Sequence, residues 1–229
     1  MTASAASRSK KTGAPSSLSP KLGAAEIGCR IVVFARAPEP GKVKSRLIPA
    51  LGEAGAAALH RRMVMHSLRA AQDAGLGPVE LWCAPDARHA FFAECEQGFG
   101  VSLHSQCEGD LGERMRHALE AVLGRARRAI LVGSDIPALS ARYLRDAERA
   151  LSAHDAVIGP AEDGGYVLIG LERCDPELFH HIEWGGSEVL AQTRLRIAAL
   201  RWRCLELPAL WDVDRPEDLN RLPEEMRAP

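Results

Sequence analysis

The chain contains the stretch Ile130-Leu131-Val132-Gly133-Ser134-Asp135-Ile136-Pro137-Ala138-Leu139. Its continuous apolar run predicts a strand buried on both faces, over about 129–133. Pro137 lacks an N–H and disfavours helix at the residue before it, so the next helix is expected from Ser140. Asp135 therefore stands just past the end of a buried strand, which is where ligands bind in open α/β sheets. The alternative is that this aspartate only organises the turn or caps the helix.

Segments typical of strands and of helices alternate along residues 28–224. Strands are predicted over 29–35, 79–83, 101–104, 129–133, 156–159, 166–170 and 202–207, and helices over 53–74, 88–97, 111–122, 139–150, 187–199 and 216–222. This alternation predicts one α/β domain with a mostly parallel sheet covered on both faces. Only a short loop with Gly164 and Gly165 separates two of the strands, which fits an antiparallel turn. One strand is therefore expected to be reversed.

Composition limits the classes of function. The chain has 229 residues, of which 46% are hydrophobic, and this can bury one substantial core. A net charge of −1 and only 5% aromatic residues argue against a nucleic-acid or membrane partner. Residues 1–27 are predicted to be a flexible tail without the apolar centre of a secretory signal, so a cytoplasmic location is expected. The six cysteines are scattered, which favours reduced thiols over a zinc site or disulfides.

A basic loop follows the first predicted strand. It carries Arg36, Lys42, Lys44 and Arg46, and its prolines and glycine restrict its shape. A diphosphate or triphosphate needs such a set of cations, with lysine as a point charge and arginine as a fork. The loop lacks the spacing of a P-loop, and a solvated charged turn is the alternative.

Acidic residues recur near predicted turns. Asp110 is placed to cap a helix whose first turn holds Arg114, and that helix start could also face an anion. Asp212 and Asp214 alternate before a helix that begins with Pro216, so in extended backbone they point the same way. One of them, Asp214 rather than Asp212, is predicted to complete with Asp135 an oxygen-rich Mg²⁺ (or Mn²⁺) site.

Glycine-rich segments accompany other polar side chains. The loop at 159–166 combines backbone freedom with carboxylates that can grip hydroxyl groups, although a hairpin turn explains its glycines equally well. Ser187 follows Trp184 and two glycines, and it either contacts a ligand or caps a helix. The residues predicted to bind substrate are Glu162, Gly164, Gly165, Tyr166 and Ser187.

Five motifs, taken in order, carry a resemblance. They are Phe34-Ala35-Arg36-Ala37-Pro38-Glu39-Pro40-Gly41-Lys42-Val43-Lys44-Ser45-Arg46-Leu47, Gly109-Asp110-Leu111-Gly112-Glu113-Arg114-Met115, Gly133-Ser134-Asp135-Ile136-Pro137, Glu162-Asp163-Gly164-Gly165-Tyr166 and Asp212-Val213-Asp214-Arg215-Pro216-Glu217-Asp218-Leu219. Over about residues 30–222 the chain resembles the bacterial glycosyltransferase-like family of GT-A fold, some of whose members are assigned to arsenosugar biosynthesis. The basic loop and the Gly-x-Asp-x-Pro turn are also similar to phospholactate guanylyltransferase and, more distantly, to the molybdenum-cofactor guanylyltransferases.

The resemblance implies a Rossmann-like, three-layer α/β/α GT-A fold in which the first and fourth strands are neighbours. It implies a nucleotide held by Ala35, Arg36, Lys42, Lys44, Arg46, Asp110 and Arg114, and a metal held by Asp135 and Asp214. Glycosyltransferases of this fold usually carry Asp-x-Asp at the metal turn, whereas Ser134-Asp135-Ile136 offers one acid.

These features are compatible with three functions. The first is Mg²⁺-dependent transfer of a glycosyl group from a nucleotide sugar to a small-molecule acceptor, with Asp163 as the candidate base, or Glu162 in its place. The second is nucleotidyl transfer from a nucleoside triphosphate, with Lys44 and Arg46 stabilising the pyrophosphate that leaves. The third is a nucleotide-binding module without catalysis. The oligomeric state is left open between a monomer and a homodimer.

Overall fold

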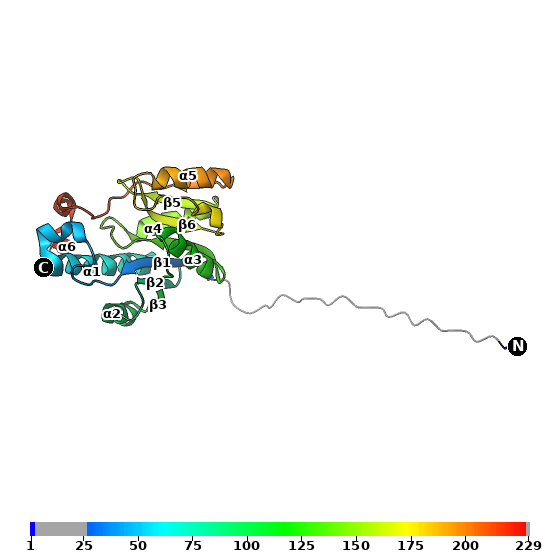
Figure 1. The fold of residues 1–229 in the computed structure, drawn as a ribbon, viewed down its shortest axis with the longest axis horizontal. Coiled ribbons are helices and arrows are strands. Elements are labelled where there is room, and N and C mark those ends of the chain that lie inside the picture. Colours follow the sequence, from blue (N-terminus) through cyan, green and yellow to red (C-terminus); the bar gives the residue numbers. More distant parts are fainter. Residues whose placement is uncertain (3–26, 228–229) are drawn as a thin grey trace.

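The computed structural model describes residues 1–2 and 27–227, and its strands form one seven-stranded sheet with the order β3-β2-β1-β4-β6-β5-β7 (Figure 1). The strands are β1 (Ile27–Arg36), β2 (Val79–Ala84), β3 (Ser102–Ser105), β4 (Ala126–Val132), β5 (Ala156–Pro160), β6 (Tyr166–Leu171) and β7 (Cys204–Glu206). β1 pairs in parallel with β4, and β6 runs antiparallel to both β4 and β5. This confirms the prediction of a mostly parallel sheet with one reversed strand. It also confirms that the first and fourth strands are adjacent. Most of the predicted tail, residues 3–26, lies outside the described residues.

Helices cover both faces of this sheet. They are α1 (Ile48–Ala74), α2 (Ala90–Phe99), α3 (Leu111–Leu123), α4 (Ala141–Leu151), α5 (Val189–Ala199) and the short α6 (Glu224–Arg227), with 3₁₀ turns η1 (Ser45–Leu47), η2 (Pro176–Leu178) and η3 (Pro216–Arg221). One core joins α1, α2 and α4 to one face of the sheet, and a second core joins α3 and α5 to the other face. In Figure 1, α5 lies at the β5 end of the molecule and α2 at the β3 end. The three-layer α/β/α fold is thus confirmed.

The central strands are apolar on both faces because helices cover both. In β1, Ile31 and Val33 enter the core of α1, α2 and α4, whereas Val32 and Phe34 enter the core of α3 and α5. A side chain of this size contributes about 1.5–3 kcal/mol when it is fully buried. The side-chain period of two along a strand therefore accounts for the continuous apolar runs in the sequence.

Some predicted boundaries were wrong. α1 begins at Ile48 instead of residue 53, but Gly52 interrupts it with φ 69° and ψ 167°, so one helical turn precedes the predicted helix. The segment predicted as a helix over 216–222 is the 3₁₀ turn η3. α5 begins at Val189, and Glu188, not Ser187, is its N-cap residue.

The C-terminal segment packs against the middle of α1. Val213, Leu222 and Met226 share a third apolar cluster with Leu59 and Met63 of α1. The amide N of Val213 also donates a hydrogen bond to the carbonyl oxygen of Asp135 at 3.0 Å. The segment that carries Asp212 and Asp214 is therefore fixed beside the turn that follows β4. Within the described residues, no helix has the length and apolar character needed to span a membrane.

Candidate active site

A cavity of about 710 Å³ lies where β1 and β4 end side by side. It collects side chains from segments far apart in sequence, because the carboxyl ends of parallel strands meet at one edge of the sheet. A cavity of about 400 Å³ shares its cationic lining, and another of about 190 Å³ shares its acidic lining. The predicted site residues that line the central cavity are Ala35, Arg36, Lys42, Lys44, Arg46, Arg114, Asp135, Asp163 and Asp214, and Asp212 lines it as well.

Asp135 is the centre of the polar contacts in the central cavity. Lys44 Nζ lies 2.8 Å from Asp135 Oδ2, and His60 Nδ1 lies 3.2 Å from Asp135 Oδ1. Burial works against the ionised carboxylate, but the charge of Lys44 and the hydrogen bond from His60 outweigh it and hold the pKa of Asp135 well below its usual range. The Lys44 side chain is only 7% exposed, whereas that of Asp135 is 37% exposed. An ionised oxygen pair therefore stays accessible from the cavity.

Lys44 adopts a backbone conformation that is unusual for its residue type. Its φ of 49° and ψ of 42° are left-handed, which costs about 1–2 kcal/mol for a residue with a Cβ. The buried ammonium group offsets this cost through its ion pair with Asp135 and a hydrogen bond to the carbonyl oxygen of Val213. The basic loop is thereby held to the turn after β4 and to the C-terminal segment.

His60 is a site residue that sequence reasoning missed. Its Nε2 lies 3.1 Å from the carbonyl oxygen of Arg36, and its Nδ1 faces Asp135. Both partners are oxygens that accept, so the ring donates to each of them from whichever nitrogen carries a proton. The ring therefore links the end of β1 to the turn after β4. A polar residue between Leu59 and Met63 on the apolar stripe of α1 was the signal in the sequence.

Gln106 was also missed. It follows β3, and its side-chain amide donates a hydrogen bond of 2.8 Å to the carbonyl oxygen of Trp82. It lines both the central cavity and the 400 Å³ cavity. Glutamine after a short strand gives no sequence pattern by which this placement could be recognised.

The two C-terminal aspartates differ in their surroundings. Asp214 forms an ion pair with Arg46. Asp212 lies beside acidic neighbours: burial and the charge of Asp163 raise the pKa of Asp212 to about 6, although Lys44 partly opposes the change. The negative charge of Asp214 is thus balanced, and that of Asp212 is balanced less well. The assignment of Asp214 to a metal stays a prediction.

We expect the substitution Asp212→Asn to stabilise the protein in a pH-dependent way. A carboxyl group with a raised folded pKa costs stability as the pH rises from its usual value of 3.8 through about 6. Asparagine does not ionise, so the variant does not lose this stability. We expect its free energy of unfolding to exceed that of the parent by about 1–3 kcal/mol near pH 8 and to be almost equal near pH 4. Urea unfolding in the presence of a chelator, at both pH values, measures the difference. An equal gain at both pH values would contradict the explanation.

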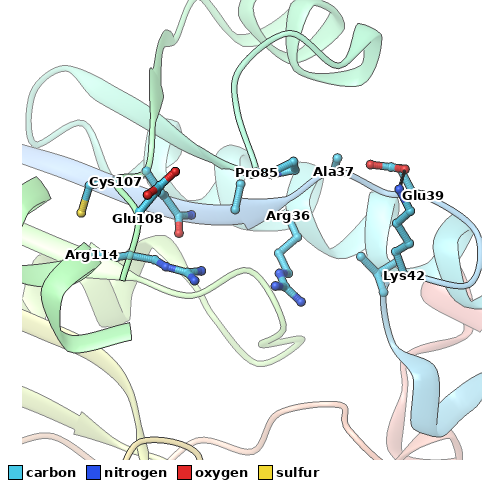
Figure 2. A pocket seen from close by; sticks show the side chains of 11 residues that line it. Arg36, Ala37, Glu39, Lys42, Pro85, Cys107, Glu108 and Arg114 are labelled. Atoms are coloured by element: carbon cyan, nitrogen blue, oxygen red, sulfur yellow. Dashed lines mark ion pairs between the residues drawn. The ribbon is translucent and has the colours of Figure 1, made fainter. Parts of the chain in front are cut away.

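Arg36 and Arg114 are the cations left open to a ligand. Lys42 pairs with Glu39 at 2.6 Å, whereas neither arginine forms an ion pair with any other described residue. Arg114 Nε donates to the carbonyl oxygen of Gly109 at 2.9 Å, which fixes the direction of its guanidinium group. Figure 2 shows both arginine side chains extending into the same open space from different segments. Two converging guanidinium groups form a place for an anion.

Three predicted binding residues have other contacts. Asp110 caps α3 in a reciprocal pair with Glu113. Glu162 accepts two hydrogen bonds, of 2.7 and 3.0 Å, from Arg221. The carbonyl of Ser187 lies against Gly164, where φ is +91° and an added Cβ would be 2.1 Å from that oxygen. None of these three side chains is part of the cavity linings, and their predicted ligand contacts stay predictions.

Trp184 forms one wall of the 190 Å³ cavity. It lies between Tyr166 and Phe179, with ring centroids 6.3 and 6.5 Å away. The indole ring also lies directly over Gly112 in the first turn of α3, where an added Cβ would come within 2.5 Å of the indole nitrogen. Glycine at this position therefore permits the wall to approach the helix.

We expect Gly112→Ala to displace Trp184, because no side chain fits between the helix and the indole. Overpacking of this kind costs about 1–3 kcal/mol. Thermal unfolding should register the loss of stability, and tryptophan fluorescence should shift in Gly112→Ala but not when Trp184→Phe is already present. Gly98→Ala in α2 is a matched control, since a Cβ there meets nothing within 4 Å. Equal effects of the two glycine substitutions would refute the packing argument.

The sheet order, the cleft at the strand ends and its paired charges define a GT-A-type α/β protein. The chain belongs to the DUF2064 family, described as an uncharacterized protein conserved in bacteria, whose model matches residues 67–186. No curated protein matches it.

Solved structures are similar over most of their length. A protein from Desulfovibrio desulfuricans G20, provisionally named a nucleotide-diphospho-sugar transferase, is 35% identical, with 83% of this chain and 84% of that chain covered and a TM-score of 0.73. A nucleotidyl transferase from Methanothermobacter thermautotroptrophicus is 15% identical (87% and 97% covered, TM-score 0.58). CMP:2-keto-3-deoxy-manno-octonic acid synthetase complexed with CTP is also 15% identical (85% and 96% covered, TM-score 0.54). The resemblance, the GT-A-type fold and the class of transferases predicted from the sequence are confirmed.

Proposed function

We propose that this protein is a Mg²⁺-dependent (or Mn²⁺-dependent) transferase that moves a glycosyl group from a nucleotide sugar to a small-molecule acceptor. The observation that carries the proposal is the division of charge in the cleft. Arg36 and Arg114 lie open at one side, and Asp135, Asp163 and Asp212 line the other parts of the central cavity. The cations suit the phosphates of the donor, and the carboxylates suit a metal and a hydroxyl group. The name of the 35% identical relative supports the same class of donor.

The residues present fit a hard divalent cation. Asp135, Asp163, Asp212 and Asp214 all line the central cavity, and carboxylate oxygens are the ligands that Mg²⁺ prefers. In the described part of the chain no three His, Cys, Asp or Glu side chains are grouped as metal ligands. Asp135 and Asp214 would hold the ion, with substrate phosphates and water as further ligands. When bound, the ion would stabilise negative charge on the departing phosphate oxygens.

The chain's own residues take defined roles in this proposal. Lys44 positions Asp135 through the ion pair of 2.8 Å. Asp163 accepts the proton of the acceptor hydroxyl group while the oxygen of that hydroxyl group attacks the anomeric carbon of the sugar. The bond from that carbon to the phosphate oxygen breaks, and Arg36 and Arg114 receive the nucleoside diphosphate that leaves. Catalysis therefore consists mainly of positioning and charge stabilisation.

Nucleotidyl transfer is the second candidate, and the number of cations favours it. Arg36, Lys42, Lys44 and Arg46 all line the central cavity, and a triphosphate carries more negative charge than a nucleotide sugar. In that reaction an acceptor oxygen attacks the α-phosphorus and pyrophosphate leaves toward Lys44 and Arg46. The two candidates use the same cleft and differ in the bond that breaks.

A panel of donors tests the proposal. We expect thermal stabilisation by a nucleotide sugar that increases with Mg²⁺, and release of nucleoside diphosphate when acceptor is added. Release of pyrophosphate from a nucleoside triphosphate would establish the second candidate instead. Binding without any product from either donor class would leave a non-catalytic nucleotide-binding module. If no nucleotide binds, all three candidate functions are overturned.

A further inference from the structure

The cavity of about 190 Å³ has a character unlike the rest of the cleft. Its walls are Met115 of α3, Tyr166 of β6, Trp184 and Val189, and Asp163 and Asp212 stand where it joins the central cavity. The volume corresponds to roughly six water molecules, which suits a ring or a short branched alkyl group. The pocket is therefore built for a compact apolar group whose polar end meets two carboxylates.

The walls of this cavity are fixed by packing. Trp184 is confined by Phe179, Tyr166 and the side-chain-free surface of Gly112. The Tyr166 hydroxyl lies 3.9 Å from Met115 Sδ, and burial raises the pKa of this phenol, so it stays protonated. The apolar walls are thus preformed, which lowers the cost of binding.

Among the described residues, the side chains that line the 190 Å³ cavity carry negative charge and no positive charge. In the described part of the chain no Lys, Arg or His lines this cavity, and its ionisable carboxyl groups are Asp163 and Asp212. The Asp163 carboxylate is oriented by a hydrogen bond of 2.9 Å from the amide N of Gly165. The unpaired guanidinium groups of Arg36 and Arg114 line the central and the 400 Å³ cavities, and they do not line this one. A phosphate or carboxylate placed in the small cavity would meet like charge and no counterion.

We propose that the acceptor is an uncharged or cationic hydroxy compound with a compact apolar end, and that phosphorylated and carboxylated acceptors are rejected. This inference rests on the proposed transferase function, because it assigns the second substrate of the same cleft. The apolar end fills the pocket beside Trp184, and the hydroxyl group faces Asp163 and Asp212. The two substrates are thereby sorted by charge: the anionic donor at the arginines, the acceptor at the aspartates.

Three probes with one apolar body test the charge selection: benzyl alcohol, benzylamine and benzyl phosphate. Their binding is measured by quenching of tryptophan fluorescence, with Trp184→Phe identifying the responding residue. We expect benzyl alcohol and benzylamine to bind, and benzyl phosphate to bind at least about tenfold more weakly. Ala161→Leu, which fills the cavity, should abolish binding of all three. Binding of benzyl phosphate as tight as that of benzyl alcohol, or no binding of any probe, would overturn the inference.

The carboxylates are tested by the double substitution Asp163→Asn and Asp212→Asn. It should bring the affinities for benzylamine and benzyl phosphate to within about threefold of each other, whereas the matched exposed substitution Asp146→Asn should leave the difference unchanged. An undiminished preference in the double variant would overturn the role of the carboxylates. Stabilisation by nucleotides is measured on the same samples. If the parent protein shows the charge preference but no nucleotide stabilises it, the transferase function fails and the selectivity of the cavity stands.

Discussion

Replacement of Asp135 by asparagine is expected to lower the transfer rate at least about hundredfold. The substitution removes the anionic oxygens that remain open to the cavity, and it leaves the Lys44 ammonium, which is 7% exposed, without its counterion. The unpaired charge should also cost about 1–3 kcal/mol of stability, because an ammonium left buried alone retains most of its desolvation penalty. Of the substitutions considered, we expect this one to have the largest effect.

Two measurements separate the catalytic effect from the structural one. Thermal stabilisation of the parent by Mg²⁺ with a nucleotide should disappear in Asp135→Asn, while the fold, followed by circular dichroism, is retained. Asp146→Asn is the control, since that carboxylate lies on α4 and pairs with surface arginines. An unchanged response to Mg²⁺ in Asp135→Asn would remove the assignment of the metal to this residue.

Removal of the open guanidinium groups is expected to weaken binding of the donor. Each of Arg36→Ala and Arg114→Ala should raise the dissociation constant of the nucleotide about tenfold or more, because a charge-assisted hydrogen bond contributes about 1.5–3 kcal/mol. The double variant should approach a hundredfold or greater loss. Since neither arginine pairs with a described acidic residue, stability should change little.

Calorimetric titration with the nucleotide at two salt concentrations measures this effect. The parent should lose affinity with added salt, and the double variant should lose much less of it, because fewer phosphate contacts remain to be screened. Arg142→Ala on α4 is the control, since this exposed arginine is distant in sequence and lines neither the central nor the 400 Å³ cavity. Equal affinities of the parent and the double variant would refute a phosphate site at these arginines.

Sequence patterns were sufficient for the architecture. The apolar run at 129–133 and the short glycine loop before Tyr166 predicted a buried central strand and a reversed neighbour, and both are present. Helices cover both faces of β4, so its residues are apolar in a continuous run. This run can be recognised in the sequence. The resemblance implied that the basic loop and Asp135 flank one nucleotide; both line the central cavity, and Lys44 pairs directly with that carboxylate.

Other features depended on contacts that local pattern does not encode. His60 reaches Asp135 from the middle of a helix, so only the packing of α1 against the strand ends reveals it. The ion pair of Arg46 with Asp214 links positions far apart in sequence. Only the folded structure therefore shows that Arg46 has an acidic partner, whereas Arg36 and Arg114 have none among the described residues. The glycines at 164 and 112 are required by close approach of Ser187 and Trp184, which are distant in sequence. Charge balance in a cleft is a property of the folded chain.

The reversed strand β6 has a consequence for how such an enzyme changes during evolution. It stands between β5 and β4, the strand that the turn with Asp135 follows, and its hairpin with β5 supplies the loop at 161–165 beside the apolar cavity. A hairpin loop can be lengthened or rewritten without disturbing the register of β1 and β4, whose ends line the central cavity. Under the proposed function, descendants of one ancestor would exchange acceptors while keeping the same nucleotide chemistry.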